Sequence, residues 1–344
     1  MSTRAVHFVG SFPAANTDDA MRAMLGAGSR LRTLPTGETR RYEWYVQPII
    51  EDLVSQGALE VKKSGSWRSS RDRTIHRAAK GELTGDMMRL GYREEAEEAM
   101  PIFTRLRTER DLPGLALQIG MPTDFTLAFI AMGATHARSQ RKAFREASIR
   151  DIDAIREAAG DDVVIQLEAT AETVLMAKAQ PMHRQMDAAL GLTRGIAEFA
   201  AAAPEGTRFG VHLCLGSMNN KARATLRDTR PLVHLANSLA RQWPSGRVLE
   251  YIHNPLAAGD IPPSKDPEFY GPLGGLALGP GTGFYAGFVH ESPTEAEQLE
   301  TLRMIEGALG RPVDGVASAC GLGRRPRAFA EALVTRAATL AAAE

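Results

Sequence analysis

The sequence predicts a single (β/α)8 (TIM) barrel spanning residues 1–344. About eight short apolar runs of strand type alternate with helical segments, which is typical of parallel strands joined by crossover helices. Polar side chains suited to chemistry stand near the carboxyl ends of several runs, the end where such barrels carry their active sites. The length also fits, because this fold commonly takes about 250 residues or more.

Each expected strand is an apolar run bounded by Gly, Pro or charged residues. The strands are expected at 6–13, 59–62, 114–122, 162–168, 208–216, 247–254, 284–290 and 316–323. Helices are expected from the 3.6-residue pattern and from capping residues. They are placed at 16–28, 42–56, 94–110, 125–157 with a break, 172–203, 219–242, 292–309 and 325–342.

Two signals fix helix starts most clearly. Asn16 precedes two aspartates and offers an N-cap to the first helix. Ser292 is expected to cap the helix to about Leu309, because Pro293 follows it and Glu295 stands three residues on, as in a capping box.

An inserted long loop is expected around residues 64–85, which are rich in Ser, Arg and Gly and show no clear period. Loops of that length in a compact domain are functional or mobile. Arg68, Arg71 and Arg73 would either bind an anionic substrate or form a solvated surface.

Composition indicates a soluble globular protein with 44% hydrophobic and 24% charged residues. The 41 basic and 41 acidic residues balance, so no net charge draws the chain to nucleic acid or a membrane. No run reaches the ~18 apolar residues of a spanning helix, and the first residues lack the apolar core of a signal peptide. Two cysteines do not make a disulfide framework. We expect a cytoplasmic protein with reduced thiols.

The strand at 208–216 carries His212 and Cys214 two positions apart, so both side chains point to the same face. Cys320 ends another apolar run before glycines, and Glu250 lies among apolar neighbours in a third. Imidazole, two thiolates and a carboxylate would suit zinc. The alternatives are that these cysteines and this histidine are simply buried core residues, or that the two cysteines form a disulfide.

The segments Val9-Gly-Ser-Phe-Pro13, His212-x-Cys214, Gly279-Pro-Gly281 with Val289-His290, and Cys320-Gly-Leu-x-Arg324 occur in one order along the chain. In that order they resemble the catalytic barrel of cobalamin-independent methionine synthase, a member of the superfamily that includes uroporphyrinogen decarboxylase. The resemblance is to a short, single-barrel member, and it extends over nearly the whole chain.

The resemblance implies zinc ligation by His212, Cys214 and Cys320, with Glu250 as the carboxylate ligand and His253 as its substitute. It also implies proton transfer by His290. Ser11 matches a serine that contacts substrate. Glu38, Gln166 and Glu168 are further expected to bind substrate, Glu38 from its Leu-Pro-Thr-Gly-Glu loop and the other two from one face of the 162–168 strand.

The family's Asp-Glu-Pro motif, whose aspartate holds the amino group of homocysteine, is absent. Residues 166–170 read Gln-Leu-Glu-Ala-Thr instead. We therefore expect an acceptor thiol without an α-amino group, unless Glu168 replaces the aspartate. Otherwise Glu168 would be a barrel-rim carboxylate paired with an arginine.

The resemblance implies a zinc-dependent methyl or alkyl transferase that activates a small-molecule thiol. The donor would be methyltetrahydrofolate or methylcobalamin, the latter on a corrinoid protein. Alternatives are a coenzyme M-type epoxyalkane or cobalamin-linked thiol transferase, a uroporphyrinogen decarboxylase-like enzyme, and a zinc-stabilised binding subunit without turnover.

Overall fold

The computed structural model describes residues 4–41, 44–67, 69 and 72–343, so Tyr42, Arg68 and Arg71 lie outside the described residues. Eight strands form one parallel sheet in the order β1-β10-β9-β8-β7-β6-β5-β2. Their bounds are β1 Ala5–His7, β2 Thr33–Pro35, β5 Ala116–Pro122, β6 Val163–Ala169, β7 Arg208–Leu213, β8 Val248–Pro255, β9 Gly283–Val289 and β10 Gly315–Ser318.

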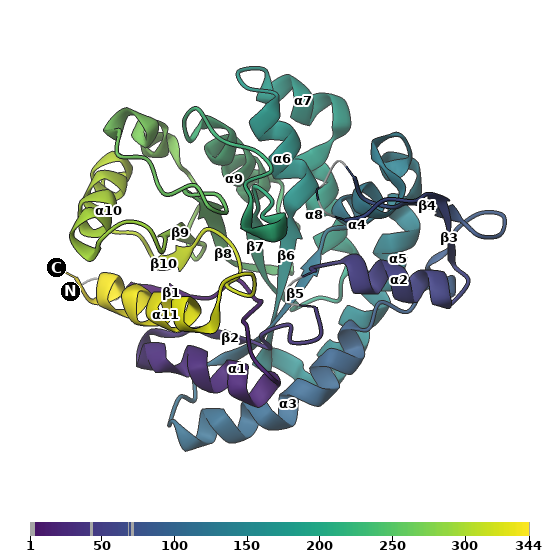
Figure 1. Ribbon diagram of the computed structural model, residues 1–344, viewed down its shortest axis with the longest axis horizontal. Coiled ribbons are helices and arrows are strands. Elements are labelled where there is room, and N and C mark those ends of the chain that lie inside the picture. Colours follow the sequence, from purple (N-terminus) through teal and green to yellow (C-terminus); the bar gives the residue numbers. More distant parts are fainter. Residues whose placement is uncertain (1–3, 42–43, 68, 70–71, 344) are drawn as a thin grey trace.

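The sheet curls until its two edge strands meet. Val6 of β1 forms a parallel bridge to Leu31, which lies just before β2, so the eight strands close into a barrel. Helices surround this barrel, and both ends of the chain lie beside β1 and α11 (Figure 1). The predicted (β/α)8 fold is confirmed.

One expected strand is wrong. The second barrel strand is Thr33–Pro35, which pairs with β5, whereas residues 59–62 belong to β3 Leu59–Lys63 outside the barrel. β3 pairs antiparallel with β4 Ile75–Ala78. The expected loop around 64–85 therefore contains the turn and second strand of a hairpin, which projects beside α2 and α4 (Figure 1). A three-residue strand gives too short an apolar run for periodicity to detect.

The helices follow the expected alternation, but only the break within 125–157 was expected, and the helix expected from residue 219 begins at Arg230. The region 125–157 divides at Gly133, whose φ of 82° interrupts the helix, and residues 172–203 form three helices. Bounds are α1 Thr17–Met24, α2 Gln47–Ser55, α3 Tyr92–Glu109, α4 Asp124–Met132, α5 Ala134–Ala159, α6 Thr170–Lys178, α7 His183–Leu190, α8 Leu192–Ala202, α9 Arg230–Gln242, α10 Glu295–Leu309 and α11 Arg327–Ala342. The capping box of α10 is real but uses Thr294 and Glu297 instead of Ser292 and Glu295.

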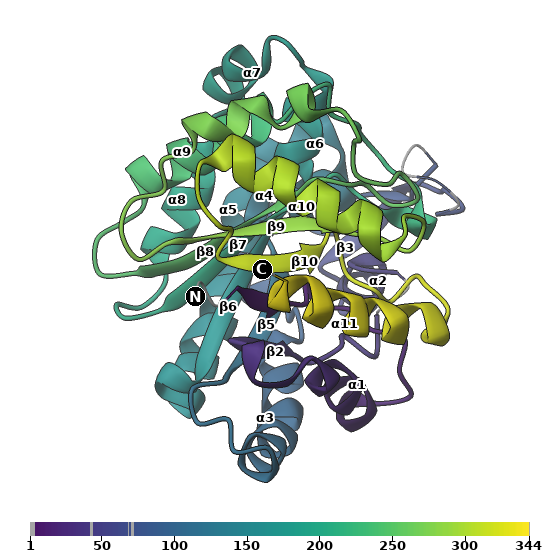
Figure 2. The same ribbon diagram turned by 90° about the vertical axis from the view of Figure 1, so that its left-hand side faces the viewer.

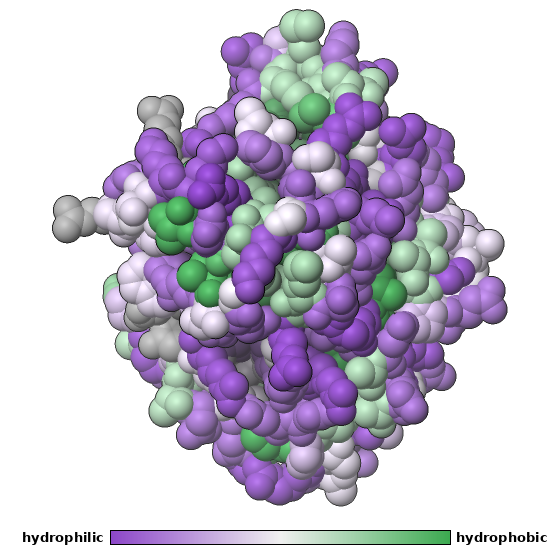
Figure 3. Space-filling view, turned by 90° about the vertical axis from the view of Figure 1, so that its right-hand side faces the viewer, coloured by the Kyte–Doolittle hydropathy of each residue, from purple (hydrophilic) through white to green (hydrophobic). Residues whose placement is uncertain are grey.

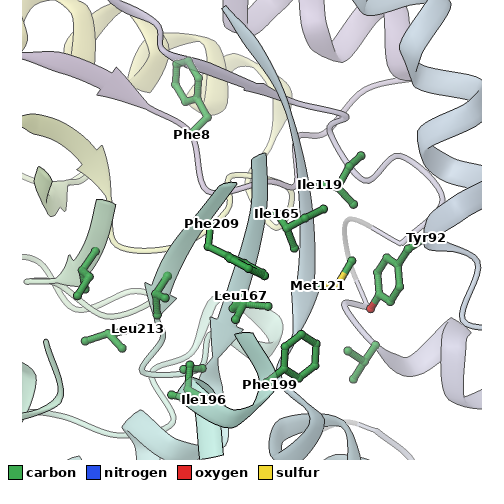
Figure 4. Close-up of a cluster of buried hydrophobic side chains, with 14 of the residues drawn as sticks. Phe8, Tyr92, Ile119, Met121, Ile165, Leu167, Ile196, Phe199, Phe209 and Leu213 are labelled. Atoms are coloured by element: carbon green, nitrogen blue, oxygen red, sulfur yellow. The ribbon is translucent and has the colours of Figure 1, made fainter. Parts of the chain in front are cut away.

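Outward-facing side chains of the strands form the main core. Ile119, Ile165, Leu167 and Phe209 point from β5, β6 and β7 toward the surrounding helices, where Phe199 of α8 meets them (Figure 4). Because successive residues of a strand face opposite sides, the residues between them point into the barrel.

The barrel interior is arranged in layers. Near the amino ends of the strands, the rings of Tyr251 and Tyr285 stack with centroids 4.7 Å apart. The next layer is polar: Gln166 Oε1 lies 3.1 Å from His7 Nε2 and accepts a 3.2 Å hydrogen bond from the Tyr251 hydroxyl. One step further, Glu168 and His212 reach the carboxyl ends of their strands, where the site described below begins.

One face of the molecule is mainly polar (Figure 3). Hydrophilic residues predominate on the face beside α5 and the β3–β4 hairpin, and apolar residues form small separate areas there (Figure 3). Among the described residues, no helix combines the length and apolar character that crossing a bilayer requires.

Candidate metal and substrate site

His212, Cys214 and Cys320 meet at the carboxyl end of the barrel. The first two belong to β7 and the residue after it, and Cys320 follows β10. Their ligand atoms all lie within 4.8 Å of one another, and the two Sγ atoms are 3.7 Å apart. Both thiols are free, since a disulfide bond would bring the sulfurs to roughly 2 Å.

The geometry of this group fits zinc. Zinc–sulfur bonds of about 2.3 Å in a tetrahedron would separate two sulfurs by roughly 3.8 Å, close to the observed distance. The Nε2 of His212 is buried and has no hydrogen-bond partner among the described residues, so its lone pair is available. Two sulfurs and one nitrogen supply three ligands, and tetrahedral zinc would keep a fourth position for a substrate atom.

The surroundings of the two sulfurs favour a thiolate at Cys320 and a protonated thiol at Cys214. The backbone N–H of Gly216 lies 3.4 Å from the Cys214 sulfur, and the Ser217 hydroxyl lies 3.1 Å from the Cys320 sulfur. The hydrogen bond between the two thiols lowers the pKa of Cys320 well below its usual range and raises that of Cys214. One proton is thus held between the sulfurs, where a metal cation would displace it.

Glu250 is not brought to this group, which corrects the expectation that it is the fourth ligand. It lies where the β7–β8 register shifts, near the amino end of β8, and forms an ion pair with Arg208 at the start of β7. Glu250 precedes His253 by three positions, roughly 10 Å along a strand. His253, the expected substitute, has both ring nitrogens in hydrogen bonds, to His212 and to the Ser318 carbonyl.

Two other expected site residues are held elsewhere. Besides its bonds to His7 and Tyr251, Gln166 donates a 2.6 Å hydrogen bond to the Val9 carbonyl, so it belongs to the interior layer of the barrel. His290 accepts from the backbone N–H of Ser292 and lies 3.1 Å from the Gly259 carbonyl. Neither residue lines the cavity described below, so proton transfer there by His290 gains no support from its position.

Glu38 and Glu168 face each other beside the cysteines. Their Oε1 atoms lie 3.1 and 2.9 Å from the point where a Cβ on Gly120 would stand, so the missing side chain of this glycine makes room for both. Each glutamate is nearly fully buried, and one oxygen of each has no hydrogen-bond partner among the described residues. Glu38 also has a φ of 50°, a left-handed backbone conformation that is uncommon outside glycine.

The cation nearest to this pair is Arg41, whose Nη1 lies 3.5 Å from Glu38, but Arg41 also binds Glu95 at 3.0 Å. Burial raises the pKa of Glu38, and the charge of Arg41 opposes this rise. Burial, followed by the charge of Glu38, raises the pKa of Glu168 well above its usual range. Burial thus outweighs the charges of Arg41 and Arg324 at Glu38, and a cationic ligand between the two carboxyls would favour their ionised forms.

A cavity of about 260 Å³ opens above these groups. His212, both cysteines, the two glutamates and Ser11 form part of its wall. The Ser11 hydroxyl also lies 3.4 Å from the backbone N–H of Gly323. The cavity thus brings together most of the residues that the sequence singled out.

Much of the remaining wall was not anticipated, and it contains both apolar and basic side chains. The apolar residues include Trp44, Tyr45, Trp67, Phe129, Ile130, Val174, Leu175 and Met218. The basic residues are Arg73, Lys178, Arg223 and Arg324. Arg73 was the described member of the expected arginine cluster, and its guanidinium lies 5.2 Å from the Phe129 ring centroid. These residues come from separate loops and helices, so no motif in the sequence joins them.

Comparison with known proteins was made at the level of sequence and of structure. No protein-family model and no curated protein matches the sequence significantly. A B12-independent methionine synthase from Shewanella sp. W3-18-1, solved in complex with selenomethionine, superposes with a TM-score of 0.62. The match covers 99% of this chain and 97% of that chain at 14% identity. The chain has the fold of this enzyme.

A second solved structure has the same fold. It is a methyltransferase from Methanosarcina mazei, with a TM-score of 0.54 and 15% identity over 97% of this chain and 93% of that chain. Both similarities extend over nearly the full length, so they include the carboxyl end of the barrel, where the metal and carboxylate groups lie. At these identities the superpositions establish the fold alone.

Proposed function

We propose that this protein is a zinc-dependent methyl or alkyl transferase that acts on a small-molecule thiol. The observation that carries the proposal is the His212, Cys214 and Cys320 group, which fits three ligands of zinc and faces a cavity. The printed names of the two structural neighbours, a methionine synthase and a methyltransferase, support transfer of a methyl group.

Zinc, when bound, would lower the pKa of a thiol in the open fourth position, so that its sulfur is present as thiolate. Two thiolates and a neutral imidazole balance the charge of the ion. The Gly216 N–H would hold the Cys214 sulfur in place, and the Ser217 hydroxyl would hold the Cys320 sulfur in place, as the two sulfurs become negatively charged. Apolar side chains around the cavity would exclude water from the reacting sulfur.

We propose that Glu38 and Glu168 bind an ammonium group of the acceptor. A positive charge between them would compensate two buried carboxylates at once, and both carboxylates share the cavity with the cysteines. The geometry thus favours the alternative in which Glu168 replaces the missing aspartate, with Glu38 as its partner. The bound selenomethionine of the Shewanella enzyme, itself an amino acid, agrees with such an acceptor.

The transfer step is a nucleophilic substitution at carbon. The acceptor sulfur would attack the methyl carbon of the donor, and a sulfur–carbon bond would form as the bond from carbon to the leaving atom breaks. The electron pair of that bond would stay on the leaving atom, which takes up a proton if it is nitrogen. Methyltetrahydrofolate and methylcobalamin on a corrinoid protein are the donors we propose to test, and the apolar wall with Trp44 and Trp67 is where the donor would enter.

The proposal is tested by binding thiols to the zinc-loaded protein. Homocysteine, 3-mercaptopropionate and 2-mercaptoethanesulfonate are compared by X-ray absorption at the zinc edge, which detects an added sulfur ligand. We expect about one zinc per chain and a third sulfur with homocysteine. Product formation with each donor then identifies the reaction. A zinc-containing protein that gains no sulfur ligand and turns over no donor would be a binding subunit, and the proposal would fail.

A uroporphyrinogen decarboxylase-like activity is the enzyme alternative within the superfamily. That chemistry needs no metal, so a protein that purifies without zinc and gains none on incubation would favour it. The fit of the three side chains to zinc argues against it.

A further inference from the structure

Three groups, the rings of His212 and His253 and the carbonyl of Ser318, are linked by hydrogen bonds beside the metal site. His253 of β8 pairs in register with His212 of β7, and their Nδ1 atoms lie 2.7 Å apart. On its other side, His253 Nε2 lies 3.1 Å from the carbonyl oxygen of Ser318, the last residue of β10. Both rings are at most 1% exposed, so water does not compete for these contacts.

The directions of these hydrogen bonds follow from the Ser318 carbonyl oxygen, which accepts the hydrogen bond at one end of the series. A carbonyl oxygen only accepts, so Nε2 of His253 carries the proton. A neutral His253 then has a lone pair on Nδ1, which accepts from Nδ1–H of His212. The opposite direction would require a charged His253, buried with only a carbonyl and another imidazole as its hydrogen-bond partners, which is costly.

His212 is thereby fixed in one tautomer. Its proton is on Nδ1, and Nε2 carries a lone pair that points toward the cysteines with no hydrogen-bond partner among the described residues. Only a deprotonated nitrogen can ligate a metal, so this tautomer is the one that serves a site on the Nε2 side.

The fold makes room for this arrangement at Gly287 of β9. A Cβ at that position would stand 2.4 Å from Nε2 of His253 and 3.0 Å from the carbonyl oxygen of Asn254. Any side chain at this position would push the His253 ring away from the Ser318 carbonyl. The ring is therefore held by its neighbours on both sides, β7 and β9, as well as by its hydrogen bonds.

We propose that His253 is a positioning residue of the metal site, which uses the Ser318 carbonyl to fix the tautomer and ring orientation of His212. This inference deepens the proposed function and rests on it for the identity of the metal.

The first test determines the ring tautomers in the wild-type protein. Nitrogen chemical shifts of ¹⁵N-histidine-labelled, metal-free protein report the tautomer of each ring, with His212 assigned from the spectrum of His212→Gln. We expect His212 with its proton on Nδ1 and His253 with its proton on Nε2. A His212 ring protonated on Nε2 would overturn the inference.

The second test measures zinc affinity by competition with a chelator. His253→Leu removes the acceptor, and we expect zinc affinity to fall roughly 10- to 100-fold, as for other partners of metal-bound histidines. His253→Asn can place its amide oxygen near His212 Nδ1 and should recover part of the loss. His76→Leu is the control, because His76 of β4 in the outer hairpin is also buried but hydrogen-bonds to the carbonyl of Ala131 in α4.

The outcomes separate this inference from the proposed function. Wild-type affinity in His253→Leu, with an unchanged His212 tautomer, would overturn the positioning role and leave the metal site intact. A wild type that binds no zinc but shows Nδ1–H on His212 would refute the proposed function and support the hydrogen-bond chain. If His253→Leu does not fold, the tautomers of the wild type still decide.

Discussion

The Sγ atoms of Cys214 and Cys320 lie 3.7 Å apart, although 106 residues separate them in the chain. The two cysteines follow β7 and β10, whose carboxyl ends open on the same side of the barrel (Figure 2). Neither strand pairs with the other. Barrel closure therefore creates the pair, and a metal bound there would link two distant parts of the chain.

Serine substitution of either cysteine should release the metal and keep the fold. The core is formed by apolar side chains between strands and helices and does not depend on these sulfurs. We expect Cys214→Ser and Cys320→Ser to lose nearly all zinc by elemental analysis, with a circular dichroism spectrum like that of the wild type. A variant that retains a full equivalent of zinc would remove that cysteine from the ligand set.

Glu250→Gln should leave the zinc content unchanged, because Glu250 pairs with Arg208 far from the cysteines. The side chains of this pair are 23% and 27% exposed. We expect the free energy of unfolding to fall by only about 0.2–1 kcal/mol, the usual range for ion pairs open to solvent. Urea denaturation and elemental analysis measure the two effects. Loss of zinc in this variant would restore Glu250 as a ligand.

Glu168→Gln should weaken binding of homocysteine and leave binding of 3-mercaptopropionate nearly unchanged. The amide keeps the shape of the side chain but removes the charge that would face an ammonium group. We expect at least a tenfold loss of homocysteine affinity, because removing one partner of a buried charge pair commonly costs 3 kcal/mol or more. Equal losses for both thiols would show that Glu168 does not recognise the amino group.

The preference for homocysteine should depend on pH. Burial raises the pKa of Glu38 and of Glu168, so these carboxyls stay protonated above the usual value of 4.5. Only the ionised forms attract an ammonium group, so affinity for homocysteine relative to 3-mercaptopropionate should rise as pH increases through the raised pKa values. Both thiols lose their own protons in a similar way, and the ratio isolates the carboxylates. The rise should be smaller in Glu168→Gln.

Gly287→Ala should impair zinc binding although it adds only a methyl group. That methyl would stand 2.4 Å from His253 Nε2, so the ring must move, and overpacking of this kind costs roughly 1–3 kcal/mol of stability. Gly307→Ala is the matched control: it lies in α10 with nothing within 4 Å of its Cβ, and alanine should stabilise the helix by up to about 1 kcal/mol. Wild-type zinc affinity in Gly287→Ala would show that the His253 ring tolerates displacement.

Sequence patterns were sufficient for the barrel because they are local. Alternation of apolar runs and helical segments located seven of the eight barrel strands. Only the second barrel strand was misplaced. Residues 59–62 were expected as the second barrel strand, but residues 33–35 take that place because they pair with β5. The sequence could not show this pairing, because the two partners lie far apart along the chain.

The two-residue period of β7 likewise determined that His212 and Cys214 share a face. The tertiary structure decided everything that depends on neighbours across strands. The register shift between β7 and β8 puts Glu250 near the amino end and His253 beside His212. The loop after β2 brings Glu38 to Glu168 over Gly120. A strand's own sequence fixes which face a side chain takes, but its height in the barrel and its contacts depend on register and closure, which are properties of the whole sheet.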